Sequence, residues 1–533
     1  MRARAALAAM AAGLLLLAGC TPAPPSPTGS PSPTSAVESG PLVHTDWSQL
    51  TPYQPFEAVE ERWYEEYTDR LIPREDYGTL VPYAVPRSTY QLSWDDDGTL
   101  YTHQSYGFAD RTGRVVTDPV FSSIYQFTAY LPSTGQVEYL PCWVISSGEI
   151  LPGEENARCA VAALDGSWCT GFDYLGPSEG MGLAGGEDGL LLFDLEDRCA
   201  VLLSPEGKEL LSIPAEREEF SDYWDLAGCG YDLMMGLSVS DGIVVRQRYD
   251  ENYSFVGAEL YDLSAGTWTE LPDVTQVSPF SEGLAAARDG ESGLWGYLDP
   301  RGEWAIAPAY TAADSFTGGQ AIVWDGDRCL LLDTAGRTVR DLGLCEGAYR
   351  TGGYLSVTPL EGAAYWLDEN GRQTPQELDG AQVTCSIDGC LCYSTGGELV
   401  LLFPDREVRL STDYEPLGLN GDLLTLYRYD EAGQSWSYAM MDLSGQLLYC
   451  SDRCSSLYLL KDPLEPDAPA LAVAMEGERY IVLSREGEPL FTSTAIPERY
   501  GDLLQASDSF SAGLRDLEGN WVLRLSSFGE SLD

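Results

Sequence analysis

Short apolar runs separated by tight polar turns recur along most of this chain and predict antiparallel β-hairpins. Each turn begins with Asp or Ser and closes three residues later with Gly. The Asp or Ser side chain accepts hydrogen bonds from the following backbone, and Gly adopts the positive φ that closes the turn. Eight stretches follow this rule: Asp110–Gly113, Ser204–Gly207, Asp299–Gly302, Asp333–Gly336, Asp368–Gly371, Asp442–Gly445, Ser484–Gly487 and Asp516–Gly519.

The turns belong to a longer internal repeat. Its fullest copy has an aromatic-Gly-aromatic strand, the turn, a Pro/Tyr loop and a final Phe, carried by Trp295, Gly296, Tyr297, Asp299, Gly302, Pro308, Tyr310 and Phe316. The same phrase returns at Tyr106, Gly107 and Phe108, with its turn closing at Gly113. Ordinary hairpins without common ancestry are the alternative, but reuse of the whole phrase favours a repeat.

This phrase resembles the WG-repeat family of bacterial proteins. The resemblance extends over about 430 residues from Ser105 onward, strongest near Trp295 and poorest between Cys142 and Tyr261. It implies no established catalytic activity and no functional residue that can be carried over to this chain.

A single hairpin buries too little apolar surface to be stable, so the hairpins must stack on one another. We therefore predict an all-β fold in which antiparallel hairpin repeats form a β-propeller-like array; a linear β-solenoid is the alternative. One short N-terminal helix is expected over Pro55–Leu71, where Phe56, Val59 and Trp63 recur at helical spacing. Pro73 would end it.

The N-terminus has the pattern of an export signal. Arg2 and Arg4 precede an apolar run that ends in Leu-Ala-Gly-Cys20, which resembles the bacterial lipobox. The resemblance implies removal of the signal and lipidation of Cys20; a plain signal peptide with an incidental Cys is the alternative. Four regions are expected: a lipoprotein signal peptide (1–20), a Pro/Ser/Thr-rich disordered tether (21–45), a helical or extended segment (46–95) and WG-like β repeats (96–533).

The charge and the cysteine content limit which partners, disulfides and metal sites we expect. The formal net charge of −52 becomes −54 once Arg2 and Arg4 leave with the signal, and a chain this acidic repels nucleic acids. Besides Cys20 there are 12 cysteines, and export would permit disulfides; the best candidates are Cys385, Cys390 and Cys392. No paired CxxC motif indicates a zinc site, and we expect no metal and no cofactor.

The sequence offers little catalytic machinery. The chain has only two histidines, His44 and His103, which argues against His-based metal sites and against a Ser-His-Asp catalytic triad. Ser178 lies in a G-x-S-x-G match, but its surroundings align with Ser281 of the repeat, which favours a structural role. A catalytic pair of carboxylates of the glycosidase type remains an alternative, because 83 acidic residues make every pairing plausible and none specific.

Three hypotheses follow from these observations. The preferred one is a non-catalytic binding or protein-interaction module, held by its lipid at the extracytoplasmic face of the cell membrane, with an unidentified peptide, protein or glycan ligand. The others are a carboxylate-based glycan hydrolase on a propeller scaffold and a structural envelope component.

Overall fold

The computed structural model describes residues 78–526, apart from 91–100, 118, 120, 132–135, 148–157, 176–183, 187, 216, 218–219, 222, 251–252, 431–432, 466–467 and 509–510. The predictions for the signal at 1–20, Cys20, the tether at 21–45 and the helix at Pro55–Leu71 lie outside these residues. No helix among the described residues is long and apolar enough to cross a membrane.

The described chain falls into two compact units. Unit 1 comprises residues 349–357 and 363–491, and unit 2 comprises residues 78–348, 358–362 and 492–526. Strands β22, β23 and β39 cross the divisions between them.

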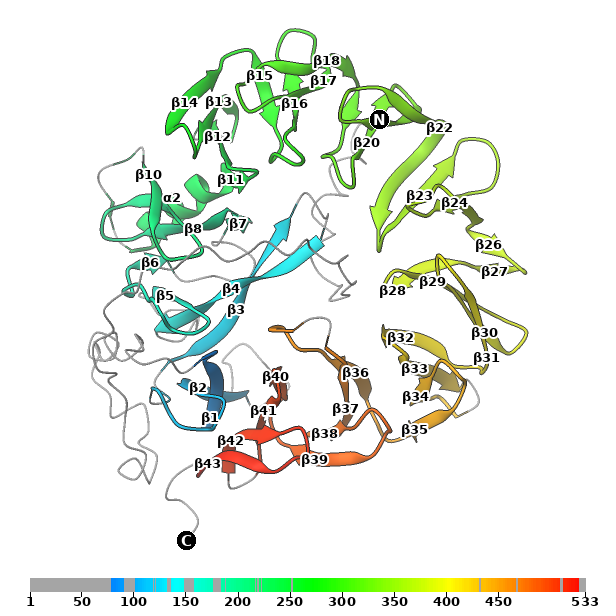
Figure 1. The fold of residues 1–533 in the computed structure, drawn as a ribbon. Helices are drawn as coiled ribbons and strands as arrows, with labels where there is room; N and C mark the ends of the chain where they lie inside the picture. The colour runs from blue at the N-terminus through cyan, green and yellow to red at the C-terminus, as the bar shows by residue number, and fades with distance from the viewer. Residues whose placement is uncertain are drawn as a thin grey trace. The chain divides into compact units, whose positions relative to one another are not determined.

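Unit 2 contains the first part of the chain and its last sheet (Figure 1). Its elements are β1 (Val81–Tyr90), β2 (Tyr101–Ala109), β3 (Ser123–Leu131), β4 (Gln136–Ser147), β5 (Arg158–Ala163), β6 (Tyr174–Leu175), β7 (Ala184–Gly186), β8 (Gly189–Asp194), β9 (Cys199–Leu203), β10 (Glu209–Pro214), α2 (Tyr223–Met235), β11 (Leu237–Ser240), β12 (Ile243–Tyr249), β13 (Phe255–Asp262), β14 (Thr267–Leu271), β15 (Val274–Val277), β16 (Ala285–Asp289), β17 (Trp295–Leu298), β18 (Trp304–Tyr310), β19 (Ala312–Ala313), β20 (Gln320–Asp325), β21 (Arg328–Asp333), β22 (Thr338–Thr351), β40 (Glu498–Tyr500), β41 (Leu503–Ser507), β42 (Ser511–Asp516) and β43 (Trp521–Ser526).

Unit 1 consists of strands alone among the residues described. They are β23 (Tyr354–Pro359), β24 (Tyr365–Leu367), β25 (Gln373–Pro375), β26 (Glu377–Leu378), β27 (Ala381–Gln382), β28 (Thr384–Ile387), β29 (Cys390–Thr395), β30 (Glu398–Leu402), β31 (Glu407–Ser411), β32 (Glu415–Asn420), β33 (Leu423–Asp430), β34 (Ser435–Asp442), β35 (Leu447–Ser451), β36 (Ser456–Leu460), β37 (Leu471–Glu476), β38 (Arg479–Leu483) and β39 (Pro489–Ser493).

Consecutive strands form consecutive sheets. Four-stranded sheets in strict chain order comprise β11–β14, β15–β18, β28–β31, β32–β35, β36–β39 and β40–β43. The pairings within them are antiparallel, as in β12 with β13 and β33 with β34. This is the strand organisation of propeller blades, so the predicted all-β, propeller-like class is confirmed. A solenoid coil would instead pair its strands in parallel.

Strand β1 lies within the segment expected at 46–95 and pairs antiparallel with β2, from Val81 opposite Ala109 to Tyr90 opposite Tyr101. The stretch from Cys142 to Tyr261, where the repeat phrase is weak, overlaps the irregular eight-stranded sheet of β3 to β10 (Ser123–Pro214) and contains the helix α2.

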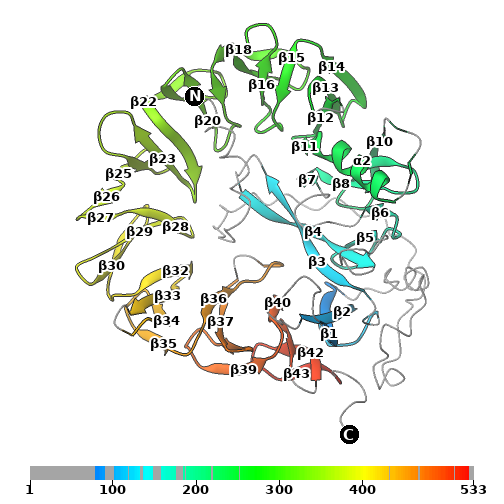
Figure 2. The same cartoon turned by 180° about the vertical axis from the view of Figure 1, so that it is seen from behind.

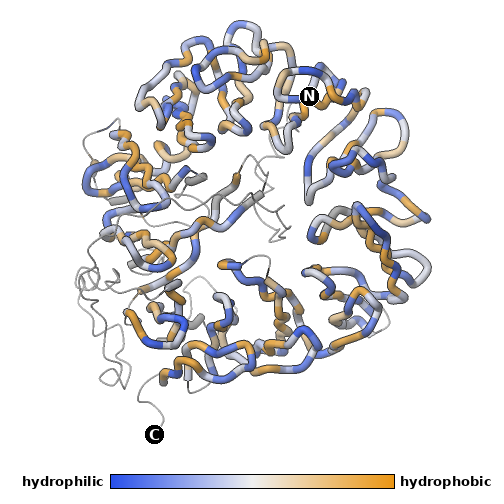
Figure 3. The backbone as a smooth tube through the Cα atoms, in the orientation of Figure 1, coloured by the Kyte–Doolittle hydropathy of each residue, from blue (hydrophilic) through white to orange (hydrophobic). Residues whose placement is uncertain are grey.

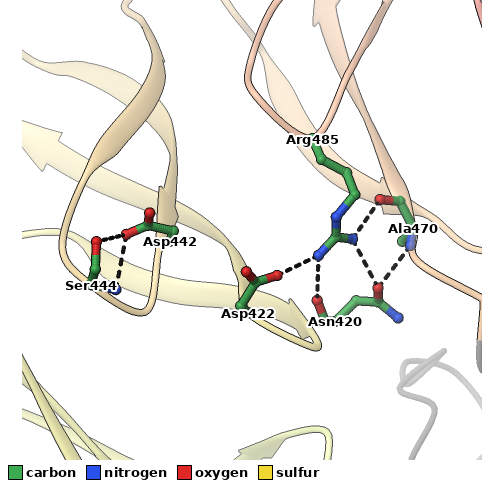
Figure 4. Close-up of polar contacts among 6 residues, drawn as sticks. All are labelled: Asn420, Asp422, Asp442, Ser444, Ala470 and Arg485. Carbon is green, nitrogen blue, oxygen red and sulfur yellow. Dashed lines mark hydrogen bonds and ion pairs between the residues drawn. The ribbon is translucent and has the colours of Figure 1, made fainter.

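All eight predicted turns are present. In each, the closing Gly donates its N–H to the carbonyl of the opening Asp or Ser at 2.8–3.0 Å, and its φ lies between +74° and +88°. The opening carboxylates orient the turns: Asp442 Oδ1 accepts the N–H of Ser444 at 2.9 Å (Figure 4). The same oxygen accepts the N–H of Gln446, also at 2.9 Å. Local sequence therefore determines these turns without help from tertiary contacts.

The turns also join neighbouring sheets. A Cβ on Gly302 would lie 2.8 Å from Leu271 Cδ2, because the turn after β17 packs on β14, the fourth strand of the preceding sheet. A Cβ on Gly113 would lie 2.5 Å from the carbonyl oxygen of Val522 on β43. The first repeat thus packs against the last sheet within unit 2, where β1 also contacts β41 and β42 (Figure 2).

In unit 1 an arginine makes the corresponding connection (Figure 4). Arg485, in the turn after β38, donates to Ala470 O at 3.0 Å, to Asn420 Oδ1 at 3.3 Å and to Asp422 Oδ1 at 2.5 Å. Asn420 Oδ1 also accepts the N–H of Ala470 at 2.7 Å. The sheet β36–β39 is therefore fastened to the first turn of sheet β32–β35.

The hydrophobic core is divided into layers between sheets. On β16, Ala285 and Ala287 pack towards the preceding sheet in a cluster with Leu260 and Phe280. Ala286 packs on the opposite side, in a cluster with Phe316 and others of the next sheet. Both faces of such strands are buried, which explains why the strands read as continuous apolar runs. Orange and blue stretches accordingly alternate along the tube in Figure 3.

Helix α2 was not anticipated from the sequence. It packs beside β8 and β11 (Figures 1 and 2) and buries Ala227 and Met234 in a cluster with Phe193. Its two glycines, Gly228 and Gly230, lower helix propensity, so the sequence did not predict the helix. Packing requires a glycine at position 230, because a Cβ there would lie 2.6 Å from Phe193 Cδ1.

Candidate functional site

The repeat phrase around Trp295 is a packing device. Across β17 and β18, Trp295 lies opposite Tyr310 and Tyr297 opposite Ile306, so β18 carries a bulge around Pro308. A Cβ on Gly296 would lie 2.5 Å from the carbonyl oxygen of Ile306. The glycine of the phrase is therefore required by the close approach of the bulged strand.

The aromatic residues of the phrase hold neighbouring sheets together. Tyr297 is fully buried, its ring centroid lies 4.8 Å from that of Phe316, and its hydroxyl donates to Asp314 O at 2.8 Å. Burial raises the pKa of Tyr297 far above its usual value. Trp295 and Trp304 are half-buried on either side of the sheet, as expected for stacked hairpins.

The first copy repeats this geometry. Tyr106 and Phe121 exchange backbone hydrogen bonds of 2.8 and 3.1 Å, matching the Trp295–Tyr310 pair. The backbone of Phe108 accepts the N–H of Val116 at 2.8 Å, and Gly113 closes the turn on Asp110 at 3.0 Å. Gly107 lies between two strand residues, as Gly296 does. In both copies the residues of the phrase position the hairpins.

The candidate disulfide residues lie around the β28–β29 turn. Cys390 and Cys392 are buried thiols: Cys390 Sγ donates to Leu391 O at 3.2 Å, and Cys392 Sγ lies 3.5 Å from Thr384 Oγ1. Cys385 is paired with Leu391 across the hairpin, but its side chain is not among those described. A bridge through Cys385 therefore stays a prediction.

The raised pKa values of two carboxyl groups have structural causes. Burial raises the pKa of Asp388, which receives a 3.0 Å hydrogen bond from Lys461. Burial and the neighbouring charge of Asp194 raise the pKa of Asp173. Asp194 itself caps a turn, accepting the N–H groups of Glu196 and Asp197 at 2.8 Å. Within the described part of the chain no group of three or more His, Cys, Asp or Glu is arranged to hold a metal ion.

Two of the described hairpins differ from the others, and each is a candidate binding surface of its own. We call β12–β13 (243–262) hairpin A and β33–β34 (423–442) hairpin B; they belong to units 2 and 1 respectively. In equivalent hairpins elsewhere, a short turn containing glycine joins the two strands, as at Gly326, Gly396 and Gly477. Hairpins A and B instead continue as two-stranded ribbons beyond their neighbours, because their pairing with the outer strands ends at Arg246 and Ala258 in A and at Tyr427 and Tyr438 in B.

Aromatic side chains cover the projecting ribbon of hairpin B. Tyr429 lies opposite Trp436 with ring centroids 4.7 Å apart, and Tyr427 lies 5.7 Å from the same indole. Tyr429 and Trp436 are 45% and 48% exposed, although they are among the largest apolar side chains of the sheet. A solvent-exposed aromatic cluster is unfavourable for solubility, so its presence indicates a binding surface.

Hairpin A carries the same arrangement. Tyr249 lies opposite Phe255 with centroids 6.1 Å apart, and Tyr249 is 42% exposed. Tyr253 at the tip is 73% exposed and has φ +57°, a left-handed conformation that is unfavourable for a bulky side chain. In hairpin B, Gln434 occupies the corresponding position with φ +49°.

The sequence contains a signal for these hairpins that the turn pattern obscured. Arg-Tyr-Asp-Glu occurs at 248–251 and again at 428–431, and each copy is followed by Ser and a large aromatic residue at the start of the return strand. This short duplicate lies outside the Asp/Ser-x-x-Gly turns, so the repeat phrase does not include it. Only the structure shows that both copies occupy the same hairpin of a four-stranded sheet.

A comparison with known protein families agrees with the internal repeat. Two stretches of this chain match the WG containing repeat. They cover residues 106–129 and 295–324, the two copies of the phrase described above. No match was found among curated proteins.

Among solved structures, a eukaryotic initiation factor is 10% identical, with a TM-score of 0.34, over 78% of this chain and 96% of that one. Hsv2 of Kluyveromyces lactis is 10% identical, with a TM-score of 0.22, over 46% of this chain and 89% of that one. The Pan2 WD40 domain of Neurospora crassa is 12% identical, with a TM-score of 0.22, over 53% and 87%. At such values these similarities say nothing about what this protein binds.

Proposed function

We propose that this protein is a non-catalytic binding module, tethered by a lipid to the extracytoplasmic face of the cell membrane, that engages a macromolecular partner through hairpins A and B. The observation that carries the proposal is the pair of exposed aromatic clusters on ribbons that extend beyond their sheets. The rest of the repeat array is the rigid scaffold that presents them.

The anchor is supported by the sequence around Cys20. Acylation requires the thiol of this residue, so Cys20→Ala should move the protein out of the membrane fraction or leave it mislocalised. Cell fractionation with an antibody against the ectodomain tests this. Unchanged membrane association of an exported Cys20→Ala protein would remove the lipoprotein assignment.

The binding role can be tested in cells that export the full chain. A photo-crosslinking amino acid placed at Tyr429 of hairpin B should give discrete adducts with a partner. The control position is Leu447, on β35 of the same sheet, which is similarly exposed but lies outside the ribbon. Equal labelling at both positions, or none at either, would contradict a binding surface on hairpin B and favour a purely structural envelope component.

A hydrolysis assay with the wild-type protein and one carboxylate variant distinguishes the binding module from a glycan hydrolase. Asp173 is the carboxyl group whose pKa is raised beside a second carboxylate, so Asp173→Asn is the informative variant. We expect no hydrolysis of cell-wall or host glycans by the wild-type protein. Turnover that disappears in Asp173→Asn would replace the binding role with catalysis.

A further inference from the structure

We propose that hairpins A and B each bind an extended, arginine-rich segment of a partner protein. This inference rests on the proposed function and specifies the chemistry of its ligand.

The surroundings of both hairpins are acidic. Residues 241–262 hold five acidic and two basic side chains, and residues 413–438 hold five acidic and one basic, in a chain of net charge −52. Two of the five acidic side chains of residues 413–438 are paired with arginines: Arg428 Nη1 lies 3.1 and 2.8 Å from the two carboxylate oxygens of Asp413 and stacks over Tyr414, and Arg485 donates to Asp422. Because Arg428 and Tyr429 are adjacent on a strand, they face opposite sides of the sheet.

A carboxylate lies next to the aromatic cluster of hairpin B. The hydroxyl of Tyr427 donates to Glu415 Oε2 at 2.6 Å, which holds the charge of Glu415 beside the rings. A guanidinium group on Tyr429 or Trp436 would therefore combine ring stacking with attraction to a nearby anion. Arginine satisfies both interactions with one planar side chain.

The ring geometry suits a cation. The planes of Tyr427 and Tyr429 are inclined by 39° and 48° to that of Trp436, and those of Tyr249 and Phe255 by 81°. A cation is attracted to the face of each ring separately, so the inclination between the rings does not prevent its binding. The protein uses the same contact internally, with the guanidinium carbon of Arg515 lying 3.9 Å from the Trp521 ring centre.

The similarity of hairpins A and B predicts how many partner segments one chain binds. Both hairpins have an exposed tyrosine paired with an aromatic residue across the ribbon and a non-glycine residue with positive φ at the tip. Since no other described hairpin of this type combines these features, each chain should take up two equivalent segments.

Isothermal titration calorimetry with the full chain in detergent tests the inference. The probe is an arginine-rich octapeptide, and its matched control contains neutral citrulline at every arginine position. We expect two sites per chain for the arginine peptide, binding that weakens with salt, and affinity for the citrulline peptide lower by about tenfold or more.

Variants separate specific binding from general attraction to an acidic protein. The double variant Tyr429→Ala and Trp436→Ala should leave one site, and adding Tyr249→Ala should weaken the remaining site by about tenfold. Trp268→Ala is the control, because this exposed ring pairs with Tyr261 within the sheet of hairpin A but lies outside its ribbon.

Several results would overturn the inference. They are unchanged stoichiometry in the hairpin variants, equal affinity for the citrulline peptide, or binding of a neutral oligosaccharide in place of the arginine peptide. If Tyr429 still forms crosslinks in cells, such a result refutes the ligand class and leaves the binding module intact. If no crosslinks form at Tyr429, the proposed function itself fails.

Discussion

Gly296→Ala tests whether the glycine of the repeat phrase is required by packing. The new Cβ would lie 2.5 Å from Ile306 O and 2.8 Å from Pro308 N, both backbone atoms of the bulged strand β18. A methyl group needs at least about 3.2 Å from such atoms, so β18 must move by about 0.7 Å or β17 must twist. Gly296 does not have a positive φ, so alanine meets no conformational penalty of its own.

The magnitude follows from two opposing effects. Forcing a methyl group into a closed space typically costs about 1–3 kcal/mol. Replacing Gly by Ala also restricts the unfolded chain, which stabilises the fold by about 0.4–1 kcal/mol. The steric term should prevail, and we expect Gly296→Ala to lower the free energy of unfolding by about 1–2 kcal/mol.

Urea unfolding followed by tryptophan fluorescence measures this change, because Trp295 and Trp304 flank the substituted site. Gly347→Ala is the matched control: Gly347 lies in strand β22, and no atom lies within 4 Å of its added Cβ. Because only the restriction of the unfolded chain operates there, we expect Gly347→Ala to raise the free energy of unfolding by about 0.4–1 kcal/mol. If Gly296→Ala unfolds at the same urea concentration as the control, the steric account of the phrase is wrong.

Three further predictions follow from single contacts. Tyr297→Phe removes the buried hydroxyl that donates to Asp314 O and should cost about 1 kcal/mol in urea unfolding; an unchanged midpoint would show that the bond contributes nothing. Within helix α2, the Cβ of Gly228→Ala meets no neighbour within 4 Å and should raise the free energy of unfolding by about 0.5–1 kcal/mol. The Cβ of Gly230→Ala meets the Phe193 ring and should lower the free energy of unfolding by about 1–3 kcal/mol. Thermal melts in which both variants shift in the same direction would refute this account of the helix. Burial raises the pKa of Cys142 and of Cys159 to about 12, so both thiols should resist alkylation at pH 8 while exposed Cys450 reacts. Because these folded pKa values exceed the unfolded value near 9, their contribution to stability is complete below pH 9 and is lost as the pH rises towards 12; rapid labelling of Cys142 or Cys159 in the native protein, read by mass spectrometry, would contradict their burial.

The sequence by itself determined the turns and the class of fold. An Asp442-x-x-Gly445 stretch closes through its own side chain and backbone, so the same four residues predict the same turn in every copy. Repetition of these turns between apolar runs then leaves stacked antiparallel hairpins as the way to bury both strand faces. Helix α2 escaped this reasoning because a close contact with Phe193, invisible in the sequence, requires Gly230 inside the helix.

Only the tertiary structure decided which aromatic residues belong to the core and which face solvent. Tyr297 and Tyr429 both lie on strands, each beside other aromatic residues, and their local sequences do not distinguish them. Tyr297 is buried because the next sheet covers its strand, whereas Tyr429 lies where β33 and β34 have run past their neighbours. Burial depends on which strands end first, and strand lengths are set by pairing between segments rather than by the residues at the tip.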